Sequence, residues 1–267
     1  MKIHNLVIGV DWDEARKANA FKVAESTCAS IWFDDKRQGS RRAWMEKLED
    51  FTRDLPDEDV VCAFPDDCEL HPEWEAVQRE MAESVAAEGG FADMQCNNAT
   101  GPDLYRVGWR YYETTDGFTG FGGMATALWW KKLLGLMPRF PGLQFDEAVN
   151  VFSQMEGKCI LKPSMSMVEH ILDFDSHDGN DWQNQTENIR RSVHFDPSKE
   201  FLPKTDGMVF VGRTYASNHW RFLWGMTAEE RKYSGYAGVA YGVHNSYVEK
   251  VGLPPKGTEL AEPSDGV

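Results

Sequence analysis

Two neighbouring carboxylates, Asp66 and Asp67, stand directly after the apolar run of residues 60–64. Such a short run predicts a buried strand, and ligands of open α/β sheets bind beyond the carboxyl ends of the strands. Adjacent carboxylates repel each other unless a cation, a ligand or protons relieve the repulsion. A hard divalent cation takes oxygen ligands and completes its shell with water and phosphates. The pattern therefore predicts a metal site for a phosphorylated ligand, the alternative being a solvent-exposed Pro-Asp-Asp turn.

The elements that must hold these residues alternate along the first half of the chain. One helix is marked by apolar residues at i, i+4, i+7 and i+11, namely Trp44, Leu48, Phe51 and Leu55. Strands are expected at residues 5–10, 29–33, 60–64 and 91–96, and helices at 14–25, from Ser40 to Pro56, and between Pro72 and Gly89. This repetition predicts an α/β fold with a mostly parallel sheet flanked by helices.

The second half of the chain is less regular. We expect an extended segment at 104–112, helices at 125–136 and 146–155, and a strand at 159–168. Polar residues then dominate, which predicts a core of residues 1–177 and an irregular C-terminal extension of residues 178–267. The tail from about residue 254 is rich in Pro, Gly and Glu and is expected to fray.

Charge and cysteine content restrict the class of protein. The formal net charge is −15, which counts against a general nucleic-acid or anionic-membrane binder but leaves room for a local basic groove. The five cysteines show no CxxC spacing, as is typical of reduced thiols in a cytoplasmic protein. No apolar run approaches the roughly 18–20 residues of a membrane span, so no span is expected.

Five motifs follow one another in a fixed order along the chain. They are Gly9-Val10-Asp11 after the first strand, Gly39-Ser40-Arg41-Arg42 at a helix start, Phe64-Pro65-Asp66-Asp67 after the third strand, a glycine-rich turn and helix followed by Asp146-Glu147, and His170 in Met167-Val168-Glu169-His170. The first four in this order resemble the GT-A glycosyltransferases, which transfer sugars from nucleotide-sugar donors, with Phe64-Pro65-Asp66-Asp67 at the position of the family's DxD motif, and the fifth agrees with them. The resemblance covers about residues 3–177 and implies a GT-A-like, Rossmann-type catalytic core.

The resemblance implies a metal site at Asp67 and His170. The family's last motif aspartate is usually the metal ligand, and many members place a histidine ligand near the end of the core. Mn²⁺ or Mg²⁺ would there balance the charge of the departing diphosphate. The motif of this chain departs from the family pattern in reading Pro-Asp-Asp, and Asp67-Cys68-Glu69 is an alternative frame. Asp66 is assigned to donor binding.

The same resemblance places the donor's base and ribose against Val10, Asp11 and the acid pair Asp34-Asp35, of which Asp35 is the preferred contact; a UDP-sugar is the favoured donor. Asp35 could equally be a turn residue. Arg41 and Arg42 would reach the diphosphate, since guanidinium groups suit phosphate oxygens, or would lie in a solvated helix turn. Gly120, Gly122 and Gly123 permit close backbone approach to the sugar.

In inverting members of the family the general base opens the helix after the glycine-rich turn. Here that position is Asp146 or Glu147, with Asp146 preferred, and the structural alternative is an N-cap followed by a first-turn acid. The aromatic residues Trp109, Tyr111 and Tyr112 could stack an acceptor, or could simply belong to an extended core strand.

Three functions remain open at this point. The first is a metal-dependent, inverting glycosyltransferase acting on a hydroxyl acceptor. The acceptor is a glycan or, as in bacteriophages that glycosylate their genomes, a hydroxymethylated pyrimidine in DNA. Basic residues at Lys131-Lys132-Arg139 and Arg190-Arg191 could line a DNA groove. The second function is a nucleotidyltransferase, and the third is a carbohydrate-binding module without catalysis.

Overall fold

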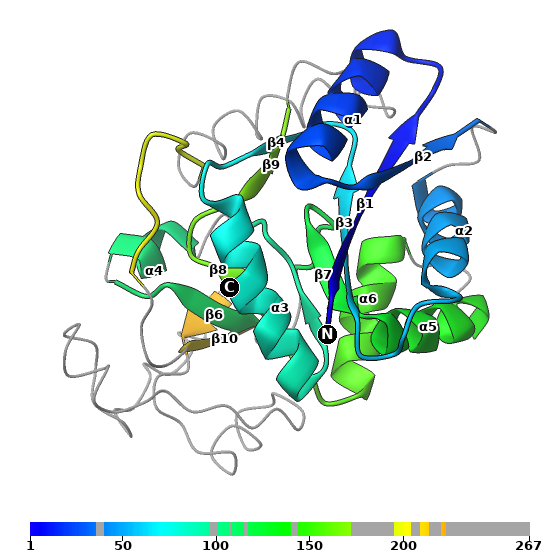
Figure 1. Cartoon of the computed structure of the whole chain (residues 1–267). Helices are drawn as coiled ribbons and strands as arrows, with labels where there is room; N and C mark the ends of the chain where they lie inside the picture. Colours follow the sequence, from blue (N-terminus) through cyan, green and yellow to red (C-terminus); the bar gives the residue numbers. More distant parts are fainter. Residues whose placement is uncertain are drawn as a thin grey trace, which may run out of the picture.

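The computed structural model describes residues 1–35, 40–96, 101–106, 108–114, 117–139, 144–171, 195–203, 209–213 and 220–222. Their central feature is a nine-stranded sheet with helices on both faces (Figure 1). The strand order is β11-β10-β6-β8-β5-β7-β3-β1-β2. The strands are β1 Ile3–Val10, β2 Ser30–Asp34, β3 Val60–Pro65, β5 Phe91–Ala92, β6 Tyr111–Thr114, β7 Gly123–Thr126, β8 Ile160–Pro163, β10 Val209–Arg213 and β11 Trp220–Phe222.

Most of these strands run in one direction. β1 is parallel to β2 and β3, and β5 is parallel to β8. β7 is antiparallel to both of its neighbours, β3 and β5. When the pairings of neighbouring strands are combined across the sheet, β6, β7 and β10 are antiparallel to the other six strands. The predicted α/β fold with a mostly parallel sheet flanked by helices is therefore confirmed.

The helices form one layer on each face of the sheet. They do so because successive residues of the central strands, which point to opposite faces, are apolar. On one face Val7 packs with residues of α1 (Glu14–Thr27) and α3 (Trp74–Glu88). On the other face Leu6 and Ile8 pack with residues of the remaining long helices. These are α2 Ser40–Thr52, α5 Ala127–Leu136 and α6 Phe145–Met155. The helix starts expected near residues 14, 40 and 146 lie within one residue of the observed ones.

Three expected elements differ from the structure. The segment 104–112, expected to be extended, begins in the short helix α4 (Gly101–Arg106), and β6 starts only at Tyr111. The strand expected at 91–96 pairs only over Phe91–Ala92. The strand expected at 159–168 divides into β8 and β9 (Val168–His170), and β9 pairs antiparallel with β4 (Cys68–Leu70) in a separate two-stranded sheet. Arg139 ends a short 3₁₀ turn, Met137–Arg139.

The C-terminal part of the chain contributes to the same sheet. β10 pairs with β6, so the described strands beyond residue 177 extend the core sheet. Residues 195–203 lie against the core, where the backbone N–H of Phe201 donates to Glu73 Oε1 at 2.7 Å and the ring of His71 bonds the carbonyl of Lys199 at 3.0 Å. The expected boundary at 177 and the expected frayed tail from 254 fall outside the described residues. None of the described helices has the length and apolar character needed to cross a membrane.

Candidate functional site

The topology gathers the predicted site residues at one edge of the sheet. Because β1, β2, β3 and β5 run in the same direction, their carboxyl ends lie at one edge. The acids that follow these ends are Asp11, Asp35, the pair Asp66-Asp67 and Asp93. Asp35 is exposed and Asp11 is half-buried.

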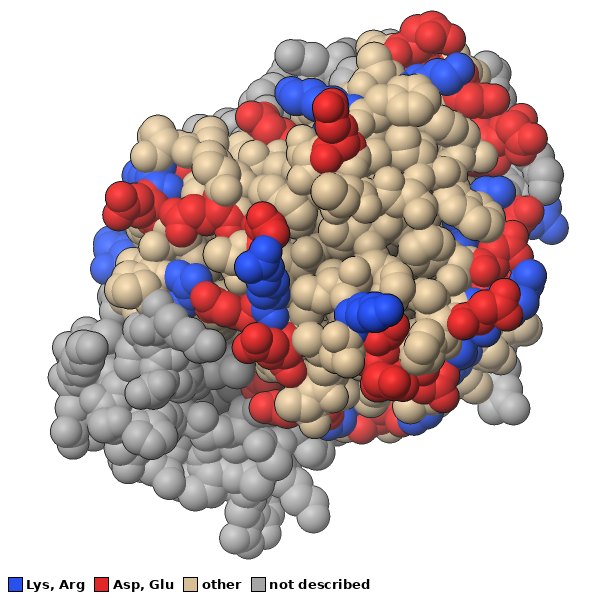
Figure 2. All heavy atoms as spheres, in the orientation of Figure 1, with Lys and Arg blue, Asp and Glu red and all other residues tan. Residues whose placement is uncertain are grey.

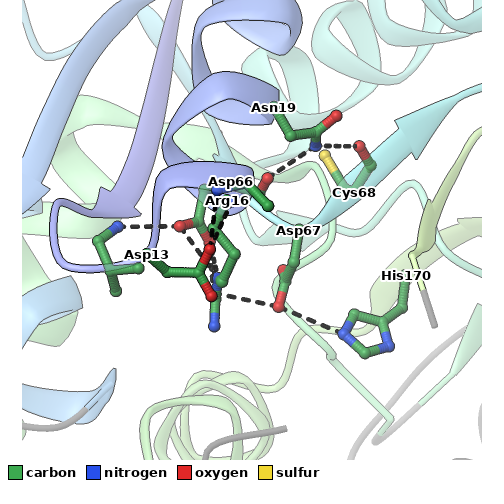
Figure 3. Close-up of polar contacts among 9 residues, drawn as sticks. Asp13, Arg16, Asn19, Asp66, Asp67, Cys68 and His170 are labelled. Carbon is green, nitrogen blue, oxygen red and sulfur yellow. Dashed lines mark hydrogen bonds and ion pairs between the residues drawn. The ribbon is translucent and has the colours of Figure 1, made fainter. Parts of the chain in front are cut away.

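Asp66 is the most deeply buried member of the predicted metal motif, with 1 % of its surface exposed. Its Oδ2 accepts from the backbone N–H of Val10 at 2.9 Å, and both of its oxygens lie 3.2 Å from Nε of Arg16 (Figure 3). Gly9 makes this approach possible, because a Cβ built at Gly9 would lie 3.0 Å from the Cβ of Asp66. Burial raises the pKa of Asp66, and the hydrogen bond from Arg16 opposes that rise.

Arg16 is the residue that connects the two carboxylates. Asp13 caps α1 by accepting from the N–H groups of Ala15 and Arg16, which sets Arg16 in the first turn of the helix beside the sheet edge. Its Nη2 bonds Asp66 and lies 3.2 Å from Asp67 Oδ2. Burial alone would lower the pKa of Arg16, but the charge of Asp67 and the bond to Asp66 raise it. Arg16 therefore relieves the carboxylate repulsion that the sequence assigned to a metal.

Sequence reasoning missed Arg16, because the observation that singles it out, its burial, comes from the structure. A cation in the first turn of a helix opposes the helix dipole, so an arginine there that is also buried must have an acidic partner nearby. Only 8 % of Arg16 is exposed. The partner lies 50 residues away in the sequence, beyond the reach of any helix-spacing rule.

Asp67 meets the second predicted metal ligand. β4 and β9 pair so that Cys68 stands opposite His170. This pairing brings His170 Nε2 to 3.3 Å from Asp67 Oδ2, although the two residues are 103 positions apart. Both side chains remain partly accessible, at 15 % for Asp67 and 17 % for His170. Burial would raise the pKa of Asp67, but the hydrogen bond from His170 and the charge of Arg16 hold it below its ordinary value.

The described side chains offer a divalent cation at most two ligands at this edge of the sheet. Among the described residues no three His, Cys, Asp or Glu side chains form a metal-binding group. Asp67 and His170 supply one oxygen and one nitrogen, while Asp66 is occupied by Arg16 and Val10. Mg²⁺ and Mn²⁺ sites of this kind use one or two side chains and take their other ligands from phosphates and water.

The glycine-rich turn lies between the metal-ligand candidates and α6. Its Phe121 ring packs edge-on against His170, with centroids 5.6 Å apart, and the N–H of Phe118 donates to Asn150 of α6 at 3.0 Å. Gly122 has a left-handed φ of 68°, and a Cβ there would lie 2.9 Å from Met94. The turn therefore fills a space in which a side chain at Gly122 would not fit.

The other predicted residues have varied surroundings. Asp146 is half-buried at the second position of α6, whose first residue, Phe145, packs against Trp44. The side chain of Glu147 lies outside the described residues. A Cβ at Gly123 would clash with the ring of Phe118 at 2.4 Å. Val10 contributes its N–H to Asp66.

The two arginines expected to reach a diphosphate differ from one another. Nη2 of Arg41 donates to the carbonyl of Met137 at 3.2 Å, which ties α2 to the end of α5. Arg42 is exposed. Arg41 therefore forms a structural contact between α2 and the end of α5, whereas the side chain of Arg42 is accessible to an anion.

The aromatic candidates for acceptor stacking lie in the core. Trp109 and Tyr112 are both 0 % exposed, so neither ring offers a face to a ligand, in agreement with the core-strand alternative. Tyr111 is partly buried, and its hydroxyl donates to Glu80 at 2.7 Å. Burial and this bond to Glu80 raise the pKa of Tyr111 far above its ordinary value.

The basic residues proposed for a DNA groove are engaged locally where they are described. Nζ of Lys131 bonds the carbonyl of Leu55 and the carboxylate of Asp57, each at 2.9 Å, and Lys132 lies over the ring of Trp129. Arg190 and Arg191 fall outside the described residues. On the face shown in Figure 2, basic side chains lie among acidic ones without forming one basic patch.

Comparison with known proteins gives little further information. No family model matches the chain, and no curated protein does. Solved structures that match include mannose-6-phosphate isomerase from Helicobacter pylori, which is 10 % identical over 83 % of this chain and 100 % of its own, with a TM-score of 0.31. At that TM-score the likeness supports no conclusion about fold or function.

Proposed function

We propose that this chain is a metal-dependent glycosyltransferase that moves a sugar from a nucleotide-sugar donor, preferably a UDP-sugar, to a hydroxyl acceptor with inversion. One observation carries the proposal. Asp67 and His170 come from distant parts of the sequence and meet at 3.3 Å, partly exposed, at the carboxyl edge of the sheet. A nitrogen and an oxygen ligand at this edge suit a cation that also binds a diphosphate.

The residues around this pair have separate tasks in the proposed reaction. Asp67 and His170 would hold Mn²⁺ or Mg²⁺, which supplies charge stabilisation to the departing diphosphate. Arg16 contacts both Asp66 and Asp67 and gives the site a fixed positive charge. Asp11, half-buried beyond β1, is placed to accept from the ribose or the base. The backbone of the glycine-rich turn approaches the sugar.

Asp146 is proposed as the general base that accepts the proton of the acceptor hydroxyl. It stands at the start of α6, which the turn contacts through Phe118 and Asn150. Asp146→Asn should lower the transfer rate by roughly 10²–10⁴-fold and should change stability by less than about 1 kcal/mol, since Asp146 lies in the first turn of α6, where the loss of a negative charge costs only its interaction with the helix dipole. Donor affinity should be retained. Full transfer activity in both Asp146→Asn and Glu147→Gln would exclude base catalysis from this helix.

Calorimetry tests donor binding directly. Titration of UDP in the presence of Mn²⁺ should show saturable binding that is lost in Asp67→Asn and reduced in His170→Gln. Glu75→Gln is the matched control, because Glu75 is an exposed acid on α3 that pairs with Arg79 of the same helix. Equal UDP–Mn²⁺ affinity in the wild type and Asp67→Asn would show that Asp67 is not a metal ligand. A nucleotidyltransferase would instead release pyrophosphate from UTP and a sugar phosphate, and a binding module would take sugar without the nucleotide.

The acceptor is the least constrained part of the proposal. A glycan and a hydroxymethylated pyrimidine in DNA both offer a primary or secondary hydroxyl group from which Asp146, as general base, could accept a proton. Retention on DNA that weakens steeply with salt would favour the nucleic acid, because phosphate contacts release counterions.

A further inference from the structure

A second buried acid–base pair lies at the same sheet edge, outside the metal-ligand candidates. Asp93 follows β5 and Lys162 lies in β8, and the side chains of both are 0 % exposed. Nζ of Lys162 lies 2.9 Å from Asp93 Oδ2 and 2.8 Å from the carbonyl oxygen of Gln95. Removing two charges from water is costly, so such a pair persists where its remaining bonds are well satisfied.

The remaining bonds of Asp93 connect the sheet to the glycine-rich turn. Asp93 Oδ2 accepts from the N–H of Thr119 at 2.6 Å and from the hydroxyl of Thr119 at 2.9 Å. Asp93 Oδ1 accepts from the N–H of Gln95 at 3.2 Å. Hydrogen bonds to an ionised acceptor are stronger than neutral ones. Thr119 is otherwise exposed, so its attachment to the buried carboxylate fixes an outer turn to the interior.

The same network continues to His170. The side-chain amide of Gln95 donates to Glu169 Oε1, which also accepts from the backbone N–H of His170 at 3.0 Å. From the other side, the ring of Phe121 packs on the imidazole of His170. The turn and His170 are thus joined twice, once through hydrogen bonds and once through an aromatic contact two residues beyond Thr119.

We infer that Asp93, Lys162 and Thr119 are positioning residues that hold the glycine-rich turn at a fixed distance from His170. This inference rests on the proposed function, in which the turn meets the donor sugar while His170 and Asp67 serve the diphosphate. A single buried carboxylate would then set the spacing between the sugar and diphosphate subsites. Lys162 anchors that carboxylate from the neighbouring strand, and none of the three residues needs to touch the donor's phosphates.

A nuclear magnetic resonance experiment tests the positioning without any substrate. The Phe121 ring shifts the imidazole proton resonances of His170, and Phe121→Leu identifies the size of that shift. Thr119→Val removes one bond to Asp93 without uncovering a buried charge, so it should move the His170 resonances towards their values in Phe121→Leu. Thr119→Ser keeps the hydroxyl and should restore them. Unchanged resonances in both Thr119→Val and Asp93→Asn would overturn the inference.

Kinetics supply the second arm. Asp93→Asn should keep the UDP–Mn²⁺ affinity of the wild type but lower kcat for transfer by roughly 10²-fold, the cost of a misplacement of about 1 Å. Glu80→Gln is the control, because Glu80 lies on α3 and forms a separate acid–base pair with the buried Arg110 at 3.0 Å. An equal loss of kcat in Glu80→Gln would reduce Asp93 to a general structural role. If the wild type binds no UDP with Mn²⁺, the proposed function fails, while the resonance measurement still decides the positioning.

Discussion

Two acid–base pairs lie at the same edge of the sheet and differ in access to solvent. Arg16 pairs with Asp66 and reaches Asp67, and 15 % of the Asp67 side chain is exposed. Lys162 pairs with Asp93, and neither side chain has any exposed surface. The first pair can exchange a partner with an incoming cation or anion through Asp67. The second is sealed from solvent and contacts only its neighbours in the fold, so the two pairs differ in whether a ligand could reach them.

The two cations suit this difference. The guanidinium of Arg16 contacts two carboxylates at once because its nitrogens form a planar fork. The ammonium of Lys162 is a compact charge whose bonds go to one carboxylate and one carbonyl. We call Arg16–Asp66, which also reaches Asp67, the open pair, and Lys162–Asp93 the sealed pair. The open pair can share its contacts with a third group, whereas the contacts of the sealed pair are fixed.

The largest expected effect comes from breaking the sealed pair. Lys162→Met should lower the free energy of unfolding by about 3–5 kcal/mol, because it leaves the buried Asp93 carboxylate without its counter-ion. Urea denaturation measures this loss. The double variant Lys162→Met with Asp93→Asn should be more stable than Lys162→Met alone. A single-variant loss like that of an exposed residue would contradict the comparison.

Breaking the open pair should cost less. Arg16→Met should lower the free energy of unfolding by roughly 1–3 kcal/mol, because Asp66, whose pKa burial already raises, can take up a proton. The loss should shrink as the pH falls and Asp66 becomes neutral. Denaturation at several pH values checks this trend, with Arg79→Met on the exposed face of α3 as the control. A loss that grows towards low pH would contradict it.

A smaller and directional effect is expected from Asp67. Its pKa is lowered in the folded protein by the His170 bond and by Arg16 against the opposing effect of burial, so folding favours its ionised form. The resulting stability is present above the ordinary pKa of 3.8 and is lost as the pH falls through the lower folded value. The wild type should therefore exceed Asp67→Asn in stability at neutral pH and converge with it in acid. If the difference in stability between the wild type and Asp67→Asn stayed the same from neutral to acid pH, the lowered pKa of Asp67 would be refuted.

The least perturbing test compares thiols beside the two pairs. Cys68 follows Asp67, and Cys96 follows Gln95; both are buried, whereas Cys28 is exposed. Burial raises the pKa of Cys96 to about 12 and raises that of Cys68 well above its ordinary value. In a Cys28→Ser background, alkylation at neutral pH should be slow at both thiols, because burial leaves little thiolate at either. Mass spectrometry of the modified peptides follows the two sites separately, and rapid alkylation of either would contradict its burial beside the pair.

The sequence was informative about elements and about one half of the site. Apolar spacing located α2, and the strand-end position of Asp66 and Asp67 predicted a charged site at the right edge. Local patterns could not show that Arg16 would reach across 50 residues to Asp66. Which cation pairs with a buried carboxylate depends on how the helices pack against the sheet. That packing cannot be predicted from a short stretch of sequence.

Residue type alone did not decide which side chains are buried. Lys162 lies in an apolar strand and is fully buried, although lysine is rarely buried without a partner. Trp109 and Tyr112, which could have been surface stacking residues, are equally buried. The short strand β5 also escaped correct prediction, since only Phe91 and Ala92 of the apolar run 91–96 find ladder partners.

The reversed strand β7 has a consequence for how the protein is assembled. In the described sheet, β2, β1 and β3 come from residues 3–65 and can pair as soon as they leave the ribosome. The strands on the other side join them only through β7, whose Met124 pairs with Cys62 and with Ala92. Contacts across such sequence separations form slowly because a long loop must close first. The growing chain should therefore hold a half-sheet with an open edge until residue 126 is made, which marks the interval in which a chaperone would be needed most.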